Sequence, residues 1–303
     1  GTYPSTDVVI TFNTISGITY TVLYSDAGPP AATVLGVAGN PVVGTGAPMT
    51  VTDTTYAGPN RCYSVREELT GGVAAVEHGV VGLNVCNPGL CAMYGMPLVP
   101  YSTALDDVIG YQMTGDMAPS LADTCSTWNV AQSKYEASFL VETSGAFPAW
   151  DGLWVDDKGT GGSTDTISWG EGFWLVNRTA AETVWLLGQV PDTAFQLNVS
   201  GTPGDEVMVG QPYPVGVTLN TDPDGYGSNP NAASGPDAAT GDNIILWNCN
   251  DTAYRTIYLA PGNIWWDDGG GASAEVLSPG EGFWIRRGSA ATNAVSWTYP
   301  MPY

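Results

Sequence analysis

The first 68 residues alternate between apolar and polar side chains in short runs, which is the period of a β-strand with one buried face. Two such runs, at 8–12 and 18–24, are separated by a turn that contains Gly17. Further runs follow, each bounded by Gly, Pro or Asn, at 34–35, 42–43, 49–53 and 62–66. The pattern predicts a small β-sandwich that ends near Glu68.

The rest of the chain contains an internal repeat. The sequence Gly-Glu-Gly-Phe-Trp occurs twice, as Gly170, Glu171, Gly172, Phe173 and Trp174, and as Gly280, Glu281, Gly282, Phe283 and Trp284. Other matches keep the same order, namely Leu83-Asn84-Val85 with Leu197-Asn198-Val199, Trp128-Asn129 with Trp247-Asn248, and Tyr135 with Tyr254. A further match, of Trp154-Val155-Asp156-Asp157 with Trp266-Asp267-Asp268, is imperfect. Matches in the same order along the chain favour a duplicated unit over chance.

These observations predict an all-β protein of tandem β-sandwich-like modules, one small N-terminal module and two homologous larger ones. We expect a first module at 1–68, repeat A at 79–190 and repeat B at 193–303, each long enough to fold as a domain. One short helix is expected between Ser102 and Met117, where a possible N-cap precedes acidic residues.

Composition supports the all-β prediction and restricts the partners. Charged residues make up 13% of the chain, while Gly (39) and Pro (22) are abundant, so frequent turns are expected and long charged helices are not. A formal net charge of -22 repels phosphate backbones and anionic lipids, so neither nucleic acid nor membrane insertion is expected. The sequence has neither a signal peptide nor a long apolar run, and we interpret it as an exported chain already processed to its mature form.

The acidic charge also suggests calcium. Copies of the chain repel one another unless cations neutralise the carboxylates, and Ca²⁺ prefers oxygen ligands. One Gly-rich loop supplies such oxygens, and its candidate ligands are Asp222, Asp224, Asn229, Asp237 and Asp242. The loop is only a fragment of a calcium-binding loop, because it lacks the closing bidentate Glu.

The chain has five cysteines, at 62, 86, 91, 125 and 249. Cys86 and Cys91 flank an Asn-Pro-Gly-Leu turn that can bring the two sulfur atoms together, so a Cys86–Cys91 disulfide is expected. An odd number leaves at least one thiol unpaired within the chain, and a buried thiol is the simplest expectation for it.

The sequence contains no recognised catalytic motif, and no enzyme activity is expected. His78 is the single histidine, and the sequence lacks Gly-x-Ser-x-Gly, Cys-x-x-Cys and phosphate-binding glycine loops. Acidic residues such as Glu171 and Glu281 recur in both repeats with the same neighbours, whereas a glycosidase uses one carboxylate pair per fold. We therefore interpret the repeated motif as a core strand with a bulge, whose Glu accepts hydrogen bonds from the backbone of a nearby turn.

The segments GITYTVLYSD, VTDTT and RCYSVRE resemble fibronectin type III-like sandwich modules of secreted bacterial multi-module surface proteins. The resemblance covers about the first 68 residues. It implies a β-sandwich at the N-terminus and an extracellular or cell-surface setting.

Two functional hypotheses follow. The first is a structural subunit of an extracellular polymer, such as a surface filament, tube or layer, whose partners are copies of itself. The alternative is a carbohydrate-binding or adhesive protein in which exposed tryptophans stack on sugar rings, with Trp150, Trp154, Trp265 and Trp266 as candidates. A hydrolase that uses carboxylates is a third possibility.

Overall fold

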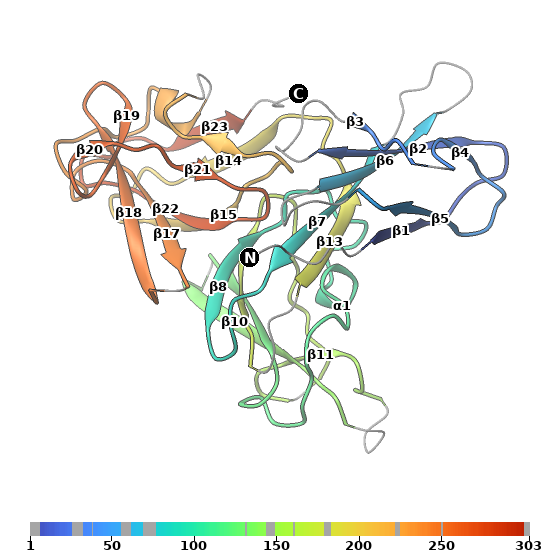
Figure 1. Ribbon diagram of the computed structural model, residues 1–303. Coiled ribbons are helices and arrows are strands. Elements are labelled where there is room, and N and C mark those ends of the chain that lie inside the picture. The colour runs from blue at the N-terminus through green and yellow to red at the C-terminus, as the bar shows by residue number, and fades with distance from the viewer. Residues whose placement is uncertain are drawn as a thin grey trace.

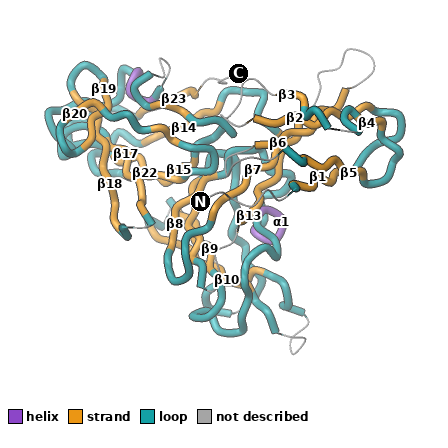
Figure 2. Tube along the Cα trace, viewed as in Figure 1, coloured by secondary structure: helices purple, strands orange, loops and turns teal. Residues whose placement is uncertain are grey.

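A computed structural model describes residues 7–25, 33–37, 39–55, 62–68, 77–130, 132–143, 149–159, 161–178, 183–221, 225–249 and 251–299. The fold is all-β, as predicted, with several antiparallel sheets that form three modules (Figure 1). The described chain has only two helical turns, α1 (Leu105–Val108) and a 3-10 turn at Tyr226–Ser228, and otherwise alternates strands with loops (Figure 2). Neither helix is long or apolar enough to cross a membrane within the described residues.

The N-terminal module, blue in Figure 1, follows the predicted runs closely. Its strands are β1 (Val8–Phe12), β2 (Thr19–Ser25), β3 (Thr33–Val34), β4 (Val42–Val43), β5 (Met49–Asp53) and β6 (Cys62–Glu68). A ribbon of β1 and β5 packs on the sheet that contains β6, β2 and β3. Ile10, Val51, Val22 and Val65 meet in the core between these layers, because alternate side chains of each strand point to the same face.

One six-stranded sheet, the shared sheet, joins the N-terminal module to repeat A (Figure 1). Five of its strands follow the order β13-β7-β6-β2-β3, and the sixth, β4, pairs with β2. Strand β7 is Glu77–Asn84 and β13 is Thr183–Gln189. Its two halves bury opposite faces. Tyr63 and Val65 of β6 point into the N-terminal core, whereas Val81 of β7 and Leu186 of β13 point into the core of repeat A. The sheet therefore spans the predicted boundary between the first module, expected to end at residue 68, and repeat A, expected to begin at residue 79.

Repeat A contains a five-stranded sheet in the order β11-β10-β9-β12-β8. Its strands are β8 (Cys91–Gly95), β9 (Thr124–Asn129), β10 (Lys134–Leu140), β11 (Trp154–Asp156) and β12 (Gly172–Val176). The ribbon of β7 and β13 lies across this sheet and α1 packs beside them, so Leu83 and Val184 share a core with Phe173, Leu175 and Leu105.

Repeat B has the same plan. Its main sheet runs β15-β22-β17-β18-β19-β20, a second ribbon pairs β14 with β23, and a short one pairs β16 with β21. The strands are β14 (Phe195–Val199), β15 (Glu206–Gly210), β16 (Val217–Thr218), β17 (Asn243–Asn248), β18 (Ala253–Ala260), β19 (Ile264–Asp267), β20 (Gly271–Ala272), β21 (Val276–Leu277), β22 (Gly282–Arg286) and β23 (Val295–Tyr299). Strands β8, β9, β10, β11 and β12 correspond in order to β15, β17, β18, β19 and β22.

The strand registers confirm this correspondence and correct one sequence match. Trp128 lies opposite Tyr135 in repeat A, as Trp247 lies opposite Tyr254 in repeat B. Five residues after each tyrosine a leucine pairs with a tryptophan: Leu140 with Trp154, and Leu259 with Trp265. Trp154 therefore corresponds to Trp265 rather than to Trp266, and the two Asp-Asp pairs that follow align without a gap.

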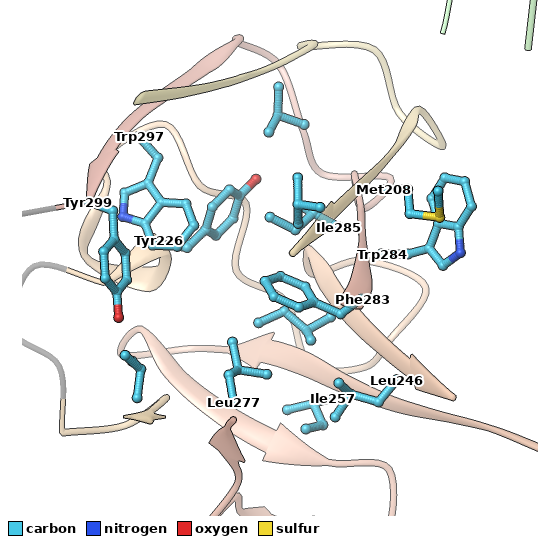
Figure 3. Packing of buried hydrophobic residues seen from close by; sticks show 14 of the residues in the cluster. Met208, Tyr226, Leu246, Ile257, Leu277, Phe283, Trp284, Ile285, Trp297 and Tyr299 are labelled. Atoms are coloured by element: carbon cyan, nitrogen blue, oxygen red, sulfur yellow. The ribbon is translucent and has the colours of Figure 1, made fainter. Parts of the chain in front are cut away.

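The Phe-Trp pair of the repeated motif points to both faces of its strand (Figure 3). Phe283 and Ile285 lie inside repeat B among Leu246, Ile257 and Leu277. Trp284 extends from the other face beside Met208, which is its partner on β15. Because alternate positions of a strand face opposite sides, this tryptophan is free to contact repeat A.

Candidate functional site

The two repeats meet through backbone groups at the repeated motif, and the contact has pseudo-twofold symmetry. Tyr94 on β8 forms a β-bridge with Glu281, and the corresponding Val209 on β15 forms one with Glu171. The bridges are matched by hydrogen bonds of 2.9 Å from the N–H of Gly95 to the carbonyl oxygen of Gly280, and from Gly210 to Gly170. Equivalent surfaces contact each other, as in an isologous dimer, but within one chain.

Glycine is required where the two backbones approach. A Cβ atom on Gly95 would collide with the Cα atom of Gly210, and a Cβ atom on Gly210 would collide with the Cα atom of Gly95. Gly170 and Gly280 have φ angles of 74° and 77°, a conformation that other residues rarely adopt. Gly170 and Gly280 of the motif thus permit the turns, and Gly95 and Gly210 on the neighbouring strands permit the contact.

Glu171 and Glu281 hold the turns that precede their strands. A carboxylate oxygen of Glu171 accepts a hydrogen bond of 2.9 Å from the N–H of Ser168, and Glu281 accepts the equivalent bond of 2.8 Å from Ser278. Burial raises the pKa of Glu171, and it raises the pKa of Glu281 to about 6. Both carboxyls make the backbone bond that the structural interpretation of the motif expects.

Two aromatic groups cross the contact. Trp284 of repeat B packs edge-on against Trp128 and Tyr135 of repeat A, with ring centroids 5.1 and 6.2 Å apart. Trp174 of repeat A makes the equivalent contacts in repeat B, with Trp247 at 5.5 Å and Tyr254 at 6.5 Å. Each motif tryptophan therefore completes a group of three aromatic residues whose other two members belong to the other repeat.

A disulfide joins Cys86 to Cys249, so the predicted Cys86–Cys91 bridge is wrong. The bond links the two repeats across 163 residues of sequence, with Cα atoms 6.4 Å apart. Cys91 keeps a free, half-buried thiol, while its carbonyl oxygen accepts a 2.7 Å hydrogen bond from the indole N–H of Trp247. Cys125 is a free, buried thiol, and burial raises the pKa of both thiols.

On the opposite side of the pseudo-twofold axis, the same contact contains an open groove of about 240 Å³. Its lining is apolar and aromatic except at Glu171, and it includes Trp128, Val130, Trp169, Phe195, Leu197, Val207, Met208 and Val209. The positions that correspond to Trp169 and Val130 in the other half are Pro279 and Cys249. One side of the contact is therefore closed by a disulfide and the other holds a groove.

Trp169 is fixed in place by contacts with repeat B. Its indole N–H donates a hydrogen bond to the carbonyl oxygen of Pro212. Its ring packs edge-on against Phe195 and Tyr213, with centroids 5.1 and 5.9 Å apart. The ring remains half-buried, so part of it lines the groove.

The predicted calcium ligands do not form a cluster among the described residues. Asp222 and Asp224 lie outside those residues. Asn229 binds Ser296 and Asn231, with its amide donating to the former and its carbonyl oxygen accepting from the latter. Within the described part of the chain, no three acidic, histidine or cysteine side chains gather to hold a metal ion.

The remaining two calcium candidates bind protein groups instead. Asp237 accepts hydrogen bonds from the backbone of Ala239 and Thr240, which close a turn. Asp242 is fully buried and forms an ion pair with Arg287, also fully buried. The prediction that Asp242 is a calcium ligand is therefore wrong, because its carboxylate is buried and is paired with Arg287.

Asp242 and Asp123 are equivalent and hold the same turn in both repeats. Asp242 accepts 2.9 Å hydrogen bonds from the N–H groups of Ala233 and Gly288. Asp123 accepts bonds of 2.8 and 2.6 Å from Thr114 and Arg178. Burial raises the pKa of Asp123. In each repeat one donor lies nine residues before the aspartate, Thr114 before Asp123 and Ala233 before Asp242.

The four tryptophans predicted to stack on sugars have different environments. Trp154 and Trp265 are 0% and 2% exposed, so they are core residues and that expectation is wrong for them. Trp266 is half-buried, and Trp150 is 40% exposed. Trp169 and Phe195, which line the groove, were not among the predicted residues, because their role depends on the contact between the repeats.

His78 lies away from the contact between the repeats, on β7. Its Nδ1 atom bonds the hydroxyl of Tyr101, and its Nε2 atom lies 3.8 Å from a carboxylate oxygen of Glu67. These contacts tie the shared sheet to the segment that follows β8.

Comparisons of the chain with protein-family models, with curated proteins and with solved structures each found no match. The resemblance of the first 68 residues to fibronectin type III-like modules therefore stays an expectation.

Proposed function

We propose that the protein is a structural subunit of an extracellular polymer built from copies of itself. The observation that carries this proposal is an uncharged surface on the shared sheet. Trp185 and Leu187 of β13 are 40% and 50% exposed, and Val80 of β7 lies opposite Leu187 on the same face. Large apolar side chains gathered on one sheet face are typical of protein interfaces.

Charge restricts the surface that a second copy can use. Two copies that each carry a formal charge of -22 repel one another over most of their surfaces. The β13 surface (Val80, Trp185 and Leu187) contains no charged side chain, so its own residues add no charge repulsion when two copies approach each other there. Charged ions from solution, with calcium as the predicted one, would reduce the remaining repulsion.

The backbone of β13 is already hydrogen-bonded along its outer edge. A second copy would therefore pack on the face of the sheet and not add a strand to its edge. The side chain of Gln112 bonds both the N–H and the carbonyl oxygen of Trp185, at 2.8 and 3.0 Å. Val99 bonds both backbone groups of Gln189 at 2.9 Å. These bonds occupy backbone groups that another strand would need.

The internal construction of the chain suits a mechanical role. The shared sheet joins the first two modules, and backbone bridges, crossed aromatic groups and a disulfide join the two repeats. Disulfides are typical of proteins outside the cytosol. A subunit with these links resists relative movement of its modules.

The test is self-association of the purified chain measured by sedimentation velocity over a range of concentration and salt. We expect large assemblies of the parent protein, and their loss in Leu187→Asp and in Trp185→Ser. Val276→Asp is the matched control, because Val276 is 45% exposed in repeat B and receives the same charge. A parent protein that stays monomeric at every salt and calcium concentration contradicts the proposal.

A further inference from the structure

The groove beside Trp169 is the main departure from symmetry at the contact between the repeats. The glycines, the glutamates that hold the turns and the crossed aromatic groups all occur on both sides. Trp169 and Val130 instead correspond to Pro279 and Cys249. Since repeat B folds with Pro279 in place of the indole, the scaffold does not require a tryptophan at this position.

We propose that this groove binds a neutral, hydroxyl-bearing glycan chain. Its lining combines half-buried aromatic rings, Trp128, Trp169 and Phe195, with apolar side chains of β15. A sugar ring presents apolar C–H groups on its faces and hydroxyl groups at its edge, so it matches an aromatic wall beside a polar acceptor.

Glu171 supplies the polar acceptor. One of its carboxylate oxygens accepts the hydrogen bond from the N–H of Ser168, and a carboxylate has further lone pairs that can accept hydrogen bonds from sugar hydroxyls. It is the one ionisable side chain among the described residues that line the groove. Without a cation in the lining, and with a formal charge of -22 on the protein, an acidic glycan or a phosphate is disfavoured.

The groove is formed before any ligand binds. Trp169 is held by Pro212, Phe195 and Tyr213, and Trp128 is held by Tyr135 and Trp284. Little side-chain freedom is lost on binding when the contacting rings are already fixed. At the rim, Val130 is 64% exposed, which leaves the mouth of the groove open to solvent.

The test is calorimetric titration of the full chain with a panel of neutral glucan, mannan, galactan and chitin oligosaccharides, with uronic-acid oligosaccharides as the acidic comparison. We expect saturable binding of at least one neutral oligosaccharide and none of the acidic ones. Val130→Arg, which blocks the rim without disturbing the core, should weaken this binding at least tenfold. Trp169→Ala should do the same, with its fold checked by near-ultraviolet circular dichroism.

Trp150→Ala is the matched control, because Trp150 is an exposed tryptophan outside the groove. Its binding should equal that of the parent protein. The proposal is overturned if no neutral oligosaccharide binds, if acidic oligosaccharides bind as well, or if Val130→Arg leaves the affinity unchanged. If the groove is shielded from solvent only in self-associated protein, its occupant is an apolar segment of a second copy. That result would also overturn the proposal.

Discussion

The two sides of the contact between the repeats share one backbone arrangement and differ in how they end. On one side Cys249 forms a disulfide with Cys86, and on the other the corresponding residue is Val130 at the rim of a groove. The bridges, the glycines and the paired aromatic groups are the same on both sides. The comparison separates the duplicated scaffold from the two features that each occur once, a covalent link and a candidate binding groove.

The largest effect is expected where the backbones touch. Gly95→Val and Gly210→Val should each destabilise the protein by more than about 4 kcal/mol, because the new side chain must push the two repeats apart. The effect should be similar for both, since the two positions are equivalent. Urea unfolding measures it, with Gly269→Ala as the control because a Cβ atom there meets no neighbour. A large difference in the free energy of unfolding between Gly95→Val and Gly210→Val would contradict the equivalence of the two positions.

The disulfide should have the next largest effect. Replacing both Cys86 and Cys249 by serine should destabilise the protein by about 2–5 kcal/mol, since the bond closes a long loop of the unfolded chain. Cys91→Ser should change stability far less, because its thiol is free. Urea unfolding of these variants without reductant, and mass spectrometry of peptides from the parent, test both statements. Detection of a Cys86–Cys91 peptide would contradict the assignment.

The buried carboxyl of Glu281 should make stability depend on pH. Its pKa of about 6 is above the ordinary value, so the folded state favours the protonated form, and stability falls as the pH rises through this value. Glu281→Gln keeps an acceptor for Ser278 and removes the charge. The variant should be more stable than the parent at pH 8 by up to about 2 kcal/mol.

Well below pH 4.5, the ordinary pKa of a glutamate, the carboxyl is protonated in both the folded and the unfolded state, so the two proteins should then unfold alike. Thermal unfolding at several pH values measures the difference. A parent protein that is as stable as Glu281→Gln at pH 8 would show that the carboxylate is better solvated than its burial indicates.

The smallest expected effect is the coupling between aromatic residues of different repeats. A double-mutant cycle of Trp128→Ala and Trp284→Ala should give about 1 kcal/mol beyond the sum of the single effects. The cycle of Trp247→Ala and Trp174→Ala should give a similar value, because the ring geometry is equivalent. Coupling on one side only would show that the aromatic groups do not contribute equally to the contact.

Much of the fold could be predicted from periodicity. The alternating runs gave the strands of the first module within a few residues, and the repeated motif indicated two related units. The pairing of β6 with β7 could not be predicted, since either strand reads equally well as the edge of its own sheet. The same limit applies to Trp154 and Trp265, because the sequence shows a tryptophan but not its burial.

The candidate site was harder to predict because it depends on contacts between distant segments. The turn between Cys86 and Cys91 made a local disulfide attractive, whereas the actual partner, Cys249, lies in the other repeat. The spacing of cysteines along the sequence does not show which distant cysteine lies close in space. Asp242 was likewise predicted to be a loop ligand, because the sequence does not show that Arg287, which directly follows β22, pairs with it.

The most direct test of the proposed structural role is electron microscopy of the native material, taken from its source without dissociation and examined with and without a calcium chelator. The account predicts ordered filaments, tubes or layers whose repeating unit fits the three-module chain, and their loosening on chelation would place divalent ions at the contacts. Separate, uniform monomers in both conditions would contradict the proposed role.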